Sequence, residues 1–480
     1  MEIPTRTDAP RVAVIGAGAA GLTAAYELSK RQIRADVFEA GPQVGGLART
    51  ISLWGQRVDL GPHRFFSTDR RVNNLWLEVA GPDFLMIDRL TRIFYNNRFF
   101  QYPIRPFDAL ANLGPAETLR CLASYGAQLI SPAPDNGAFE DWVIRAFGRR
   151  LFEIFFKTYS EKLWGIRCSE LDADFAAQRI KQFSLGEAVR SALFPKSRGK
   201  HKTLVERFAY PLNGTGAVYE RMADRIRANG GRVFLNAPVE GVEMDGGRAA
   251  GVRAGGESLA YTHVVSTMPL TLLIQRISGV PESVRESASR LRFRNTILVY
   301  LHVEGTDLFP DNWLYIHSPE LRAGRVTNFR NWSPKLYGDA KSTILCLEYW
   351  AYPEDELWSL PDPALIEMAK REIRSTGLIH RSPVTNGHVL RLNRCYPVYA
   401  RGYKELLEPV AAWIRTIPNL LAIGRYGAFK YNNQDHSILM GILAAENIAQ
   451  GANHDLWAVN TDYEVYQERA IITDTGLVDA

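Results

Sequence analysis

The stretch RVAVIGAGAAGLTAAYELSK, residues 11–30, decides the fold. A short apolar run, Arg11 to Ile15, predicts a buried strand, and it is followed by a glycine-rich turn and then by a helical pattern. The turn reads G-x-G-x-x-G at Gly16, Gly18 and Gly21, in the strand-to-helix context that gives this motif its meaning. Gly16 permits a tight turn, Gly18 lets a pyrophosphate approach the backbone, and Gly21 lets helix and strand pack closely. The sequence therefore predicts a Rossmann-type dinucleotide site.

A second predicted strand, ADVFEA, ends at Glu39, which stands where an acidic side chain binds ribose hydroxyls in such sites. The order of strand, helix and strand predicts an α/β fold with a parallel sheet. The helix N-terminus offers free N–H groups and a positive dipole end to the phosphates. The motif alone leaves NAD and FAD as alternatives.

The segment GPQVGGLART, residues 41–50, favours FAD because it resembles the glycine-doublet extension of FAD-binding amine oxidases. Gly45 and Gly46 permit backbone contact with the linker of the flavin, and Arg49 can reach its phosphates. Near the C-terminus, GRYGAFKYNNQDHSI predicts a second helix that begins close to the cofactor, and such a helix end stabilises negative charge on a reduced flavin. Further cofactor-binding residues are assigned to Val239, Arg425, Asp435, His436 and Ser437.

Composition and charge exclude several other classes of protein. The 480 residues include 57 basic and 52 acidic side chains without a long basic block, which argues against a nucleic-acid partner. The four cysteines have no CxxC spacing, so neither a metal site nor a disulfide framework is predicted. No apolar run reaches about 20 residues, the length of a membrane span. Together with the polar start MEIPTRTDAP, this predicts a soluble, cytoplasmic protein.

The pattern of strands and helices predicts a discontinuous domain organisation, because cofactor elements occur at the beginning, in the middle and near the end of the chain. A helical substrate domain and an antiparallel-sheet substrate domain are expected between them. The basic stretch at 195–202 is expected to be an exposed loop. The predicted segments are 1–104 (first part of the FAD domain), 105–190 (helical), 191–290 (return to the FAD domain), 291–400 (antiparallel sheet) and 401–480 (last part of the FAD domain).

Several segments together resemble UDP-galactopyranose mutases and their relatives in the amine-oxidase-like flavoprotein superfamily, and the resemblance can be followed over nearly the whole chain. They are DLGPHRFFS (59–67), YNNRFFQYPI (95–104), FFKTYSEKLWG (155–165), GRVTNFR (324–330) and GRYGAFKYNNQD (424–435). The chain departs from the family where a second histidine usually follows and Phe66–Ser67 stands instead, at KLWG in place of KQWG, and at NQD in place of DMD.

The resemblance implies roles for individual residues. His63 would lie beside the flavin, Arg325 would contact a diphosphate, and Arg425 would lie near the flavin; these three are the catalytic candidates. The implied substrate-binding residues are Tyr159 (stacked on uracil), Trp164 (lining the sugar site), Tyr431 (on the diphosphate), and Arg179, Arg294, Tyr349 and Tyr396. Without the resemblance, the aromatic residues could equally pack in the core and the arginines other than Arg425 could be structural ion-pair members.

The first functional hypothesis is a non-redox ring rearrangement of a nucleotide-linked sugar through N5 of the reduced flavin, with NAD(P)H as an external reductant. The second is an FAD-dependent oxidoreductase acting on a sugar or natural product, which the altered motifs favour. The third is a flavin-bound binding protein without turnover. The expected partner is a small molecule, a nucleotide-diphosphate sugar, and a homodimer is left open.

Overall fold

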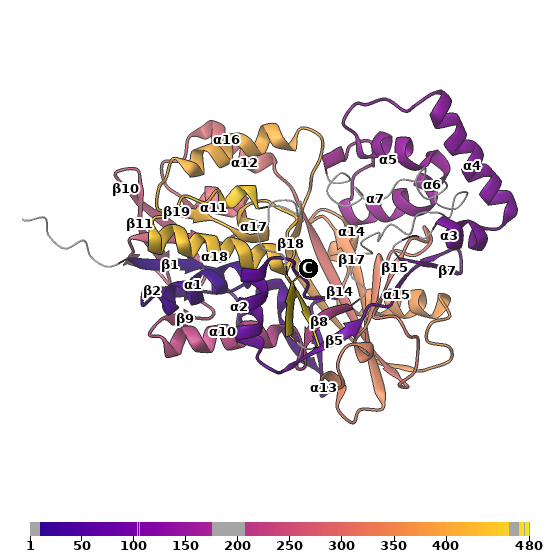
Figure 1. The fold of residues 1–480 in the computed structure, drawn as a ribbon, viewed down its shortest axis with the longest axis horizontal. Helices are drawn as coiled ribbons and strands as arrows, with labels where there is room; N and C mark the ends of the chain where they lie inside the picture. The colour runs from indigo at the N-terminus through magenta and orange to yellow at the C-terminus, as the bar shows by residue number, and fades with distance from the viewer. Residues whose placement is uncertain are drawn as a thin grey trace, which may run out of the picture.

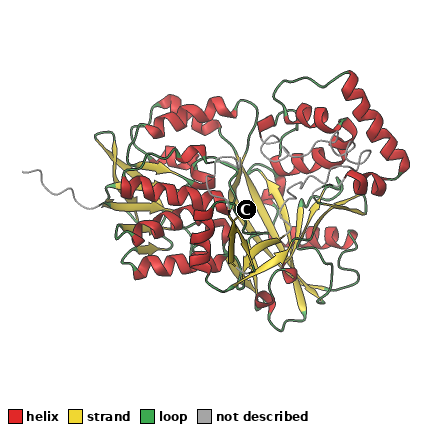
Figure 2. Ribbon diagram, viewed as in Figure 1, coloured by secondary structure: helices red, strands yellow, loops and turns green. Residues whose placement is uncertain are grey.

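The computed structural model describes residues 10–102, 104, 106–174, 207–459, 470–474 and 476–479. It has the predicted α/β architecture, with a parallel sheet covered by helices, a second large sheet, and a layer of helices beyond it (Figures 1 and 2). The parallel sheet has the order β19 (Leu420–Ala422), β13 (His263–Ser266), β1 (Arg11–Ile15), β2 (Arg34–Phe38) and β9 (Arg232–Phe234).

Strand β1 lies at the centre of this sheet because both of its faces are apolar. Val12 and Val14 face one side, where α1 (Ala19–Lys30), α10 (Gly216–Ala228) and α18 (Gln434–Gln450) pack. Ala13 and Ile15 face the other side, in a cluster with residues of α11 (Leu270–Arg276), α12 (Glu282–Arg290), α16 (Tyr403–Arg415) and the strands β10 (Val239–Asp245) and β11 (Arg248–Ala254). Such two-sided burial is typical of a parallel sheet that is covered on both faces.

Helices α1 and α18 lie side by side although they are more than 400 residues apart in sequence (Figure 1). Their contact depends on Gly441, where an added Cβ would lie 2.6 Å from the carbonyl oxygen of Ala20. This close approach brings the start of α18 near the start of α1, so both helix N-termini serve the same site.

The second sheet has seven strands, and each neighbouring pair is antiparallel except β15 with β6, which are parallel. Its order is β18 (Val384–Pro397), β14 (Phe293–Glu304), β17 (Ser342–Ala351), β16 (Arg325–Asn328), β15 (Trp313–Ile316), β6 (Thr91–Tyr95) and β7 (Arg98–Gln101). Leu345, Leu347 and Tyr349 on β17 belong to a cluster with residues of α15 (Asp362–Ser375), so Glu348 faces the opposite side.

Smaller sheets complete the strand structure. A three-stranded sheet joins β10 (Val239–Asp245), β11 (Arg248–Ala254) and β12 (Glu257–Ala260). Three two-stranded pairs join β3 (Thr50–Leu53) with β4 (Gln56–Asp59), β5 (Phe84–Asp88) with β8 (Arg207–Pro211), and β20 (Ala470–Thr473) with β21 (Gly476–Asp479). The remaining helices in these parts are α2 (Arg70–Ala80), α13 (Pro334–Tyr337), α14 (Glu356–Ser359) and α17 (Gly424–Gly427).

The described part of the predicted helical segment, 106–174, consists mainly of helices joined by loops. It contains α3 (Pro106–Leu113), α4 (Pro115–Ile130), α5 (Phe139–Phe147), α6 (Arg149–Phe152), a π-helical turn (Glu153–Lys157) and α7 (Thr158–Trp164). Lys162 of α7 fastens this layer to the second sheet, because its ammonium group donates to the carbonyl oxygens of Ile316 (3.2 Å), Ser318 (2.7 Å) and Ala323 (3.3 Å). Arg179 and the basic stretch 195–202 lie outside the described residues.

The division into five segments stays a prediction, and the strand pairing differs from it in one respect. Strands β6 and β7 fall within 1–104, the first part of the expected FAD domain, yet they extend the seven-stranded sheet. The link is the parallel pairing of β6 with β15, over 200 residues later in the chain. Local sequence patterns do not indicate a pairing strand that lies so far away in the chain.

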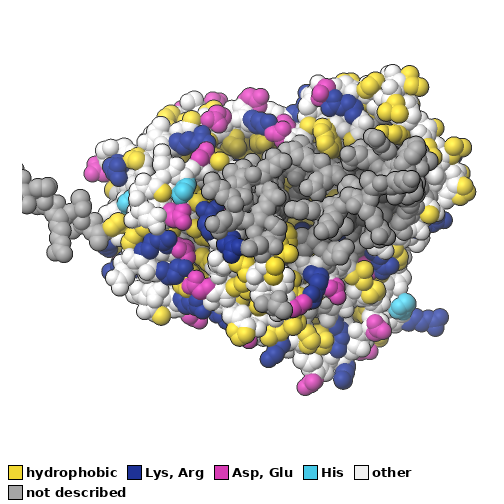
Figure 3. Space-filling view, viewed as in Figure 1, with side chains coloured by type: hydrophobic (Ala, Val, Ile, Leu, Met, Phe, Trp, Pro, Cys, Tyr) yellow, Lys and Arg dark blue, Asp and Glu magenta, His cyan; other side chains and the backbone are white. Residues whose placement is uncertain are grey.

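The surface charge and the lengths of the helices agree with what the composition and the lengths of the apolar runs predict. On the face drawn in Figure 3, basic and acidic side chains are interspersed, without a broad basic stripe among the described residues. No helix in the described part of the chain combines the length and the apolarity needed to cross a membrane.

Candidate cofactor and substrate site

A cavity of about 550 Å³ lies between the two large sheets. One wall is formed at the carboxyl ends of the parallel strands, where Gly16, Glu39 and Thr267 follow β1, β2 and β13. The opposite wall comes from the seven-stranded sheet, which contributes Arg325 and Glu348 among others. In open α/β sheets, ligands bind outside the carboxyl ends of the strands, so the cavity lies where a cofactor is expected.

The glycines of the fingerprint are required by close approaches. Gly16 has φ +97°, and a Cβ there would lie 2.2 Å from Oγ1 of Thr267. A Cβ on Gly21 would lie 2.0 Å from the carbonyl oxygen of Gly16, so strand and helix could not pack as they do. Gly16, Gly18, Gly45 and Gly46, which we call the glycine cradle, line the cavity.

The two glycine turns contact each other directly. The N–H of Gly45 donates to the carbonyl oxygen of Ala17 at 2.7 Å, and a Cβ on Gly46 would lie 3.0 Å from the Cα of Gly18. The backbone at the start of α1 is therefore open to the cavity. The first N–H groups of this helix and the positive end of its dipole can bind phosphates there. This surface fits the pyrophosphate of a dinucleotide.

Glu39 lines the cavity and also holds the fingerprint turn. Its Oε2 accepts from the N–H of Ala17 and its Oε1 from the N–H of Gly41, both at 2.8 Å. Arg49 lies behind Gly45, and its buried Nε has no hydrogen-bond partner among the described residues. Arg49 is not among the residues that line the cavity, so its phosphate contact stays a prediction.

The remaining cofactor candidates divide into two groups. Val239, Asp435 and Ser437 line the cavity, the last two in the first turn of α18. His436 is fully buried on the same turn, with its Nδ1 2.8 Å from Oδ1 of Asp435, and it is not among the cavity-lining residues. Its position indicates support of Asp435 rather than direct cofactor contact.

His63 lines the cavity on the loop that follows β4. Its Nδ1 lies 3.1 Å from the carbonyl oxygen of Gly61, and its own carbonyl oxygen accepts from Oγ1 of Thr215 at 2.9 Å. Burial and the charges of Arg325 and Arg425 lower the pKa of His63 to about 4. The neutral ring must carry its proton on Nδ1, because a carbonyl can only accept, so Nε2 keeps a lone pair.

The loop that carries His63 is anchored by Asp59, which sequence reasoning did not single out. This fully buried carboxylate accepts from Oγ1 of Thr50 (2.6 Å), the hydroxyl of Tyr210 (2.7 Å) and the N–H of Thr215 (3.2 Å). Burial raises the pKa of Asp59 to about 6 despite these hydrogen bonds. Thr215 links the two residues, since it also donates to the carbonyl oxygen of His63.

We expect the ring of His63 to titrate near pH 4 and not near 6.5, the ordinary pKa of histidine. NMR of protein with labelled histidine checks this, with His63→Asn to assign the signal. The folded state then binds fewer protons than the unfolded chain between about pH 4 and 6.5, so this residue lowers stability as the pH falls through that window. A midpoint at or above 6.5 would contradict the assignment.

Arg325 lines the cavity, but its charge is already paired. Its Nε and Nη2 bind Oε1 and Oε2 of Glu348 at 2.6 and 2.5 Å, a bidentate pair. The carboxylate of Glu348 is almost completely buried, and a Cβ on Gly61 would lie 3.0 Å from its Oε1. The pair therefore connects the seven-stranded sheet to the loop of His63.

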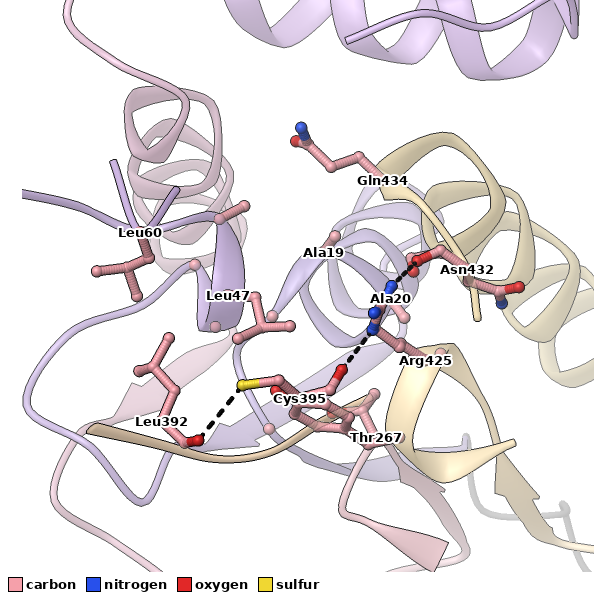
Figure 4. Close-up of a pocket in the computed structure, with 18 of the residues that line it drawn as sticks. Ala19, Ala20, Leu47, Leu60, Thr267, Leu392, Cys395, Arg425, Asn432 and Gln434 are labelled. Carbon is pink, nitrogen blue, oxygen red and sulfur yellow. Dashed lines mark hydrogen bonds between the residues drawn. The ribbon is translucent and has the colours of Figure 1, made fainter. Parts of the chain in front are cut away.

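Arg425, on α17, lies against two phenol rings. Its Nε donates to the carbonyl oxygen of Cys395 (2.7 Å) and its Nη1 to that of Asn432 (2.8 Å), as Figure 4 shows. The guanidinium carbon lies 4.7 Å from the ring centre of Tyr396 and 4.4 Å from that of Tyr431. This arrangement holds a cation at the cavity wall without a carboxylate partner among the described residues.

Of the predicted substrate-binding residues, Tyr396 and Tyr431 line the cavity together. Their rings stack with centroids 5.6 Å apart, and burial raises the pKa of Tyr396, so its hydroxyl stays protonated. Trp164 is fully buried behind them, edge-on to Tyr396 at 6.3 Å, and does not line the cavity. Its role is to support the tyrosine pair.

Three other candidates are held away from the cavity. Tyr159 stacks on His317 with centroids 4.9 Å apart. Tyr349 is fully buried on the α15 side of the sheet, where its hydroxyl donates to Glu372 at 3.2 Å, because alternate residues of a strand face opposite sides. Arg294 is buried and donates to Asp355 (2.9 Å) and to the carbonyl oxygen of Trp350 (2.7 Å). These contacts support structural roles.

The cavity also contains residues that sequence reasoning missed. They are Arg64, Arg276, Trp313, Tyr315, Glu348, Leu392 and Gln434 among others. Arg64 follows His63, which was predicted to lie beside the flavin. This position was the one feature of the sequence that could have marked Arg64 as a site residue. Trp313 and Tyr315 come from β15, between β16 and β6 in the seven-stranded sheet, and no local motif marks them.

Comparisons with known proteins find relatives of this chain among flavoenzymes. Coproporphyrinogen III oxidase of Mycobacterium leprae is 24% identical over 440 residues, 86% of this chain and 93% of that protein. A probable UDP-galactopyranose mutase of Klebsiella pneumoniae is 25% identical over 183 residues, 36% of this chain and 46% of that protein. A crystal structure of reduced UDP-galactopyranose mutase superposes with a TM-score of 0.82 at 22% identity, covering 94% of this chain and 98% of that one, which shows a shared fold.

The family profile described as flavin containing amine oxidoreductase matches residues 19–449, most of the chain. The predicted fold and the predicted FAD are thereby confirmed, and the glycine cradle is the part of the structure that fits the cofactor. The chain belongs to the flavin-containing amine oxidoreductase family.

Proposed function

We propose that this protein is an FAD-dependent enzyme that rearranges the ring of a nucleotide-diphosphate-linked sugar without net oxidation. The observation that carries the proposal is the pair of stacked tyrosines, Tyr396 and Tyr431, with Arg425 held against both rings at the cavity wall. Two phenol hydroxyls and a guanidinium without a carboxylate partner among the described residues form a donor set for the oxygens of a diphosphate. The likeness to UDP-galactopyranose mutases supports this choice of substrate.

When bound in its reduced form, FAD supplies a nucleophilic ring nitrogen that no side chain can replace. The protein residues position and neutralise the substrate around it. Arg425 and the hydroxyls of Tyr396 and Tyr431 would hold the diphosphate, while Nε2 of neutral His63 would accept a hydrogen bond from a sugar hydroxyl. Arg325 would contribute less charge than the sequence implied, because Glu348 offsets it.

An FAD-dependent oxidoreductase is the second candidate, favoured by a specific observation. The cavity contains Leu60, Leu392 and Trp313, an apolar surface suited to the C–H bonds of a larger ring system. The coproporphyrinogen III oxidase similarity, which extends over 86% of this chain, points the same way. Oxidation would begin from oxidised flavin and would need an electron acceptor in every cycle.

The redox state of the flavin separates the two candidates. We expect dithionite-reduced protein, kept anaerobic, to isomerise a UDP-hexose through many turnovers without consuming further reductant, and oxidised protein to be inactive. Chromatography of the sugar nucleotide after each incubation gives the turnover number. Anaerobic bleaching of oxidised flavin by the substrate, with one product per flavin, would instead establish the oxidoreductase and exclude the mutase.

A further inference from the structure

The cavity is rich in arginine, but its arginines differ in what they already bind. Among the described residues four arginines line it: Arg64, Arg276, Arg325 and Arg425. Arg276 donates to the carbonyl oxygen of Val239, Arg325 is paired with Glu348, and Arg425 donates to two carbonyl oxygens. Arg64 is the exception.

One nitrogen of the Arg64 guanidinium is buried without an acceptor among the described residues. Its Nη1 is buried and makes no hydrogen bond within the described part of the chain, and no carboxylate there forms an ion pair with it. A buried charged donor without a partner is unfavourable, and such groups occur where a ligand supplies the missing acceptor. The side chain lines the cavity, so the acceptor can arrive from inside it.

The backbone beneath Arg64 is held in place before any ligand binds. Its carbonyl oxygen accepts from Nε2 of Gln434 at 3.4 Å, and Gln434 itself accepts from the hydroxyl of Tyr219 at 2.7 Å. The preceding carbonyl, that of His63, accepts from Thr215 at 2.9 Å. Because the loop is tethered at successive residues, its backbone needs no ordering when a ligand binds to the Arg64 side chain.

We propose that Arg64 binds an anionic oxygen group of the substrate, a carboxylate or a phosphate, in the part of the cavity beside His63. The planar guanidinium fork matches the paired oxygens of either group. The inference rests on the proposed function only in taking this region as the substrate half of the site. The glycine cradle at the start of α1 offers backbone N–H groups to the cofactor phosphates, which leaves Arg64 for the substrate.

The test measures binding of two small anions to the FAD-loaded protein through changes in the flavin absorbance spectrum. The probes are inorganic pyrophosphate and malonate, which distinguish a phosphate from a carboxylate. The variants are Arg64→Gln and Arg64→Lys, and the matched control is Arg374→Gln, an exposed arginine of α15 outside the cavity lining. FAD content and thermal unfolding are recorded for each variant.

Saturable binding by the wild type, weakened about tenfold or more in Arg64→Gln and partly retained in Arg64→Lys at unchanged FAD content, supports the proposal. Malonate binding without pyrophosphate binding supports Arg64 while refuting the nucleotide-diphosphate substrate. The proposal is overturned if the wild type binds neither probe, if Arg64→Gln binds like the wild type, or if Arg64→Gln purifies folded but without FAD.

Discussion

Protein carrying Gly18→Leu is expected to purify folded and colourless. A Cβ on Gly18 would meet nothing closer than the Cα of Gly46 at 3.7 Å, an ordinary contact, so the fold tolerates a side chain there. The rest of the leucine would occupy the cavity between the two glycine turns, where the pyrophosphate of FAD must approach the backbone. We expect FAD affinity to fall at least about 100-fold, measured by flavin absorbance after reconstitution with excess FAD.

Two further variants make this result interpretable. Gly126→Leu, on α4 with open space around its Cβ position, should keep full FAD content. Gly21→Ala should behave differently from Gly18→Leu and lose the fold itself, because its Cβ would lie 2.0 Å from a backbone oxygen. Normal FAD content in Gly18→Leu would mean that the cofactor does not lie in the glycine cradle.

The second large effect is expected for Arg425→Ala. The change removes two hydrogen bonds from a charged donor to carbonyl oxygens and the contact with two phenol rings. We expect the free energy of unfolding to fall by about 3 kcal/mol and binding of UDP to weaken by about tenfold or more. Urea unfolding and UDP titration of the flavin spectrum measure the two quantities.

Arg425→Lys is the matched variant because it keeps the charge while losing the planar fork. It should recover part of the UDP affinity but little of the lost stability, since a single ammonium group cannot reach both carbonyls and stack on both rings. If Arg425→Ala binds UDP as tightly as the wild type does, the diphosphate assignment of this arginine fails.

The cofactor half could be predicted from sequence because its determinants are local. A strand, a glycine turn and a helix are contiguous at residues 11–30, and Gly16 and Gly21 each occupy a position where an added Cβ would clash with a neighbour. The same holds for α18: the segment GRYGAFKYNNQDHSI predicts a helix that begins there, and the helix begins at Gln434.

The substrate half resisted prediction because its geometry depends on pairings between distant strands. Tyr349 and Glu348 are adjacent in sequence, yet only the strand register decides which of them faces the cavity. Arg325 carries the charge that the sequence indicated, but Glu348 reaches it across the β16–β17 ladder and changes what that charge can do. A motif identifies the residue but not its partner.

The strand order of the parallel sheet also has a consequence for synthesis. Strand β1 takes the central place in this sheet, but its neighbour β13 is translated about 250 residues later and β19 more than 400 later. Contacts this far apart in the chain form slowly, and the earlier segment stays exposed meanwhile. The glycine turn of residues 16–21 therefore has to wait for α18, translated more than 400 residues later, to pack against α1 before both helix starts can serve the cofactor.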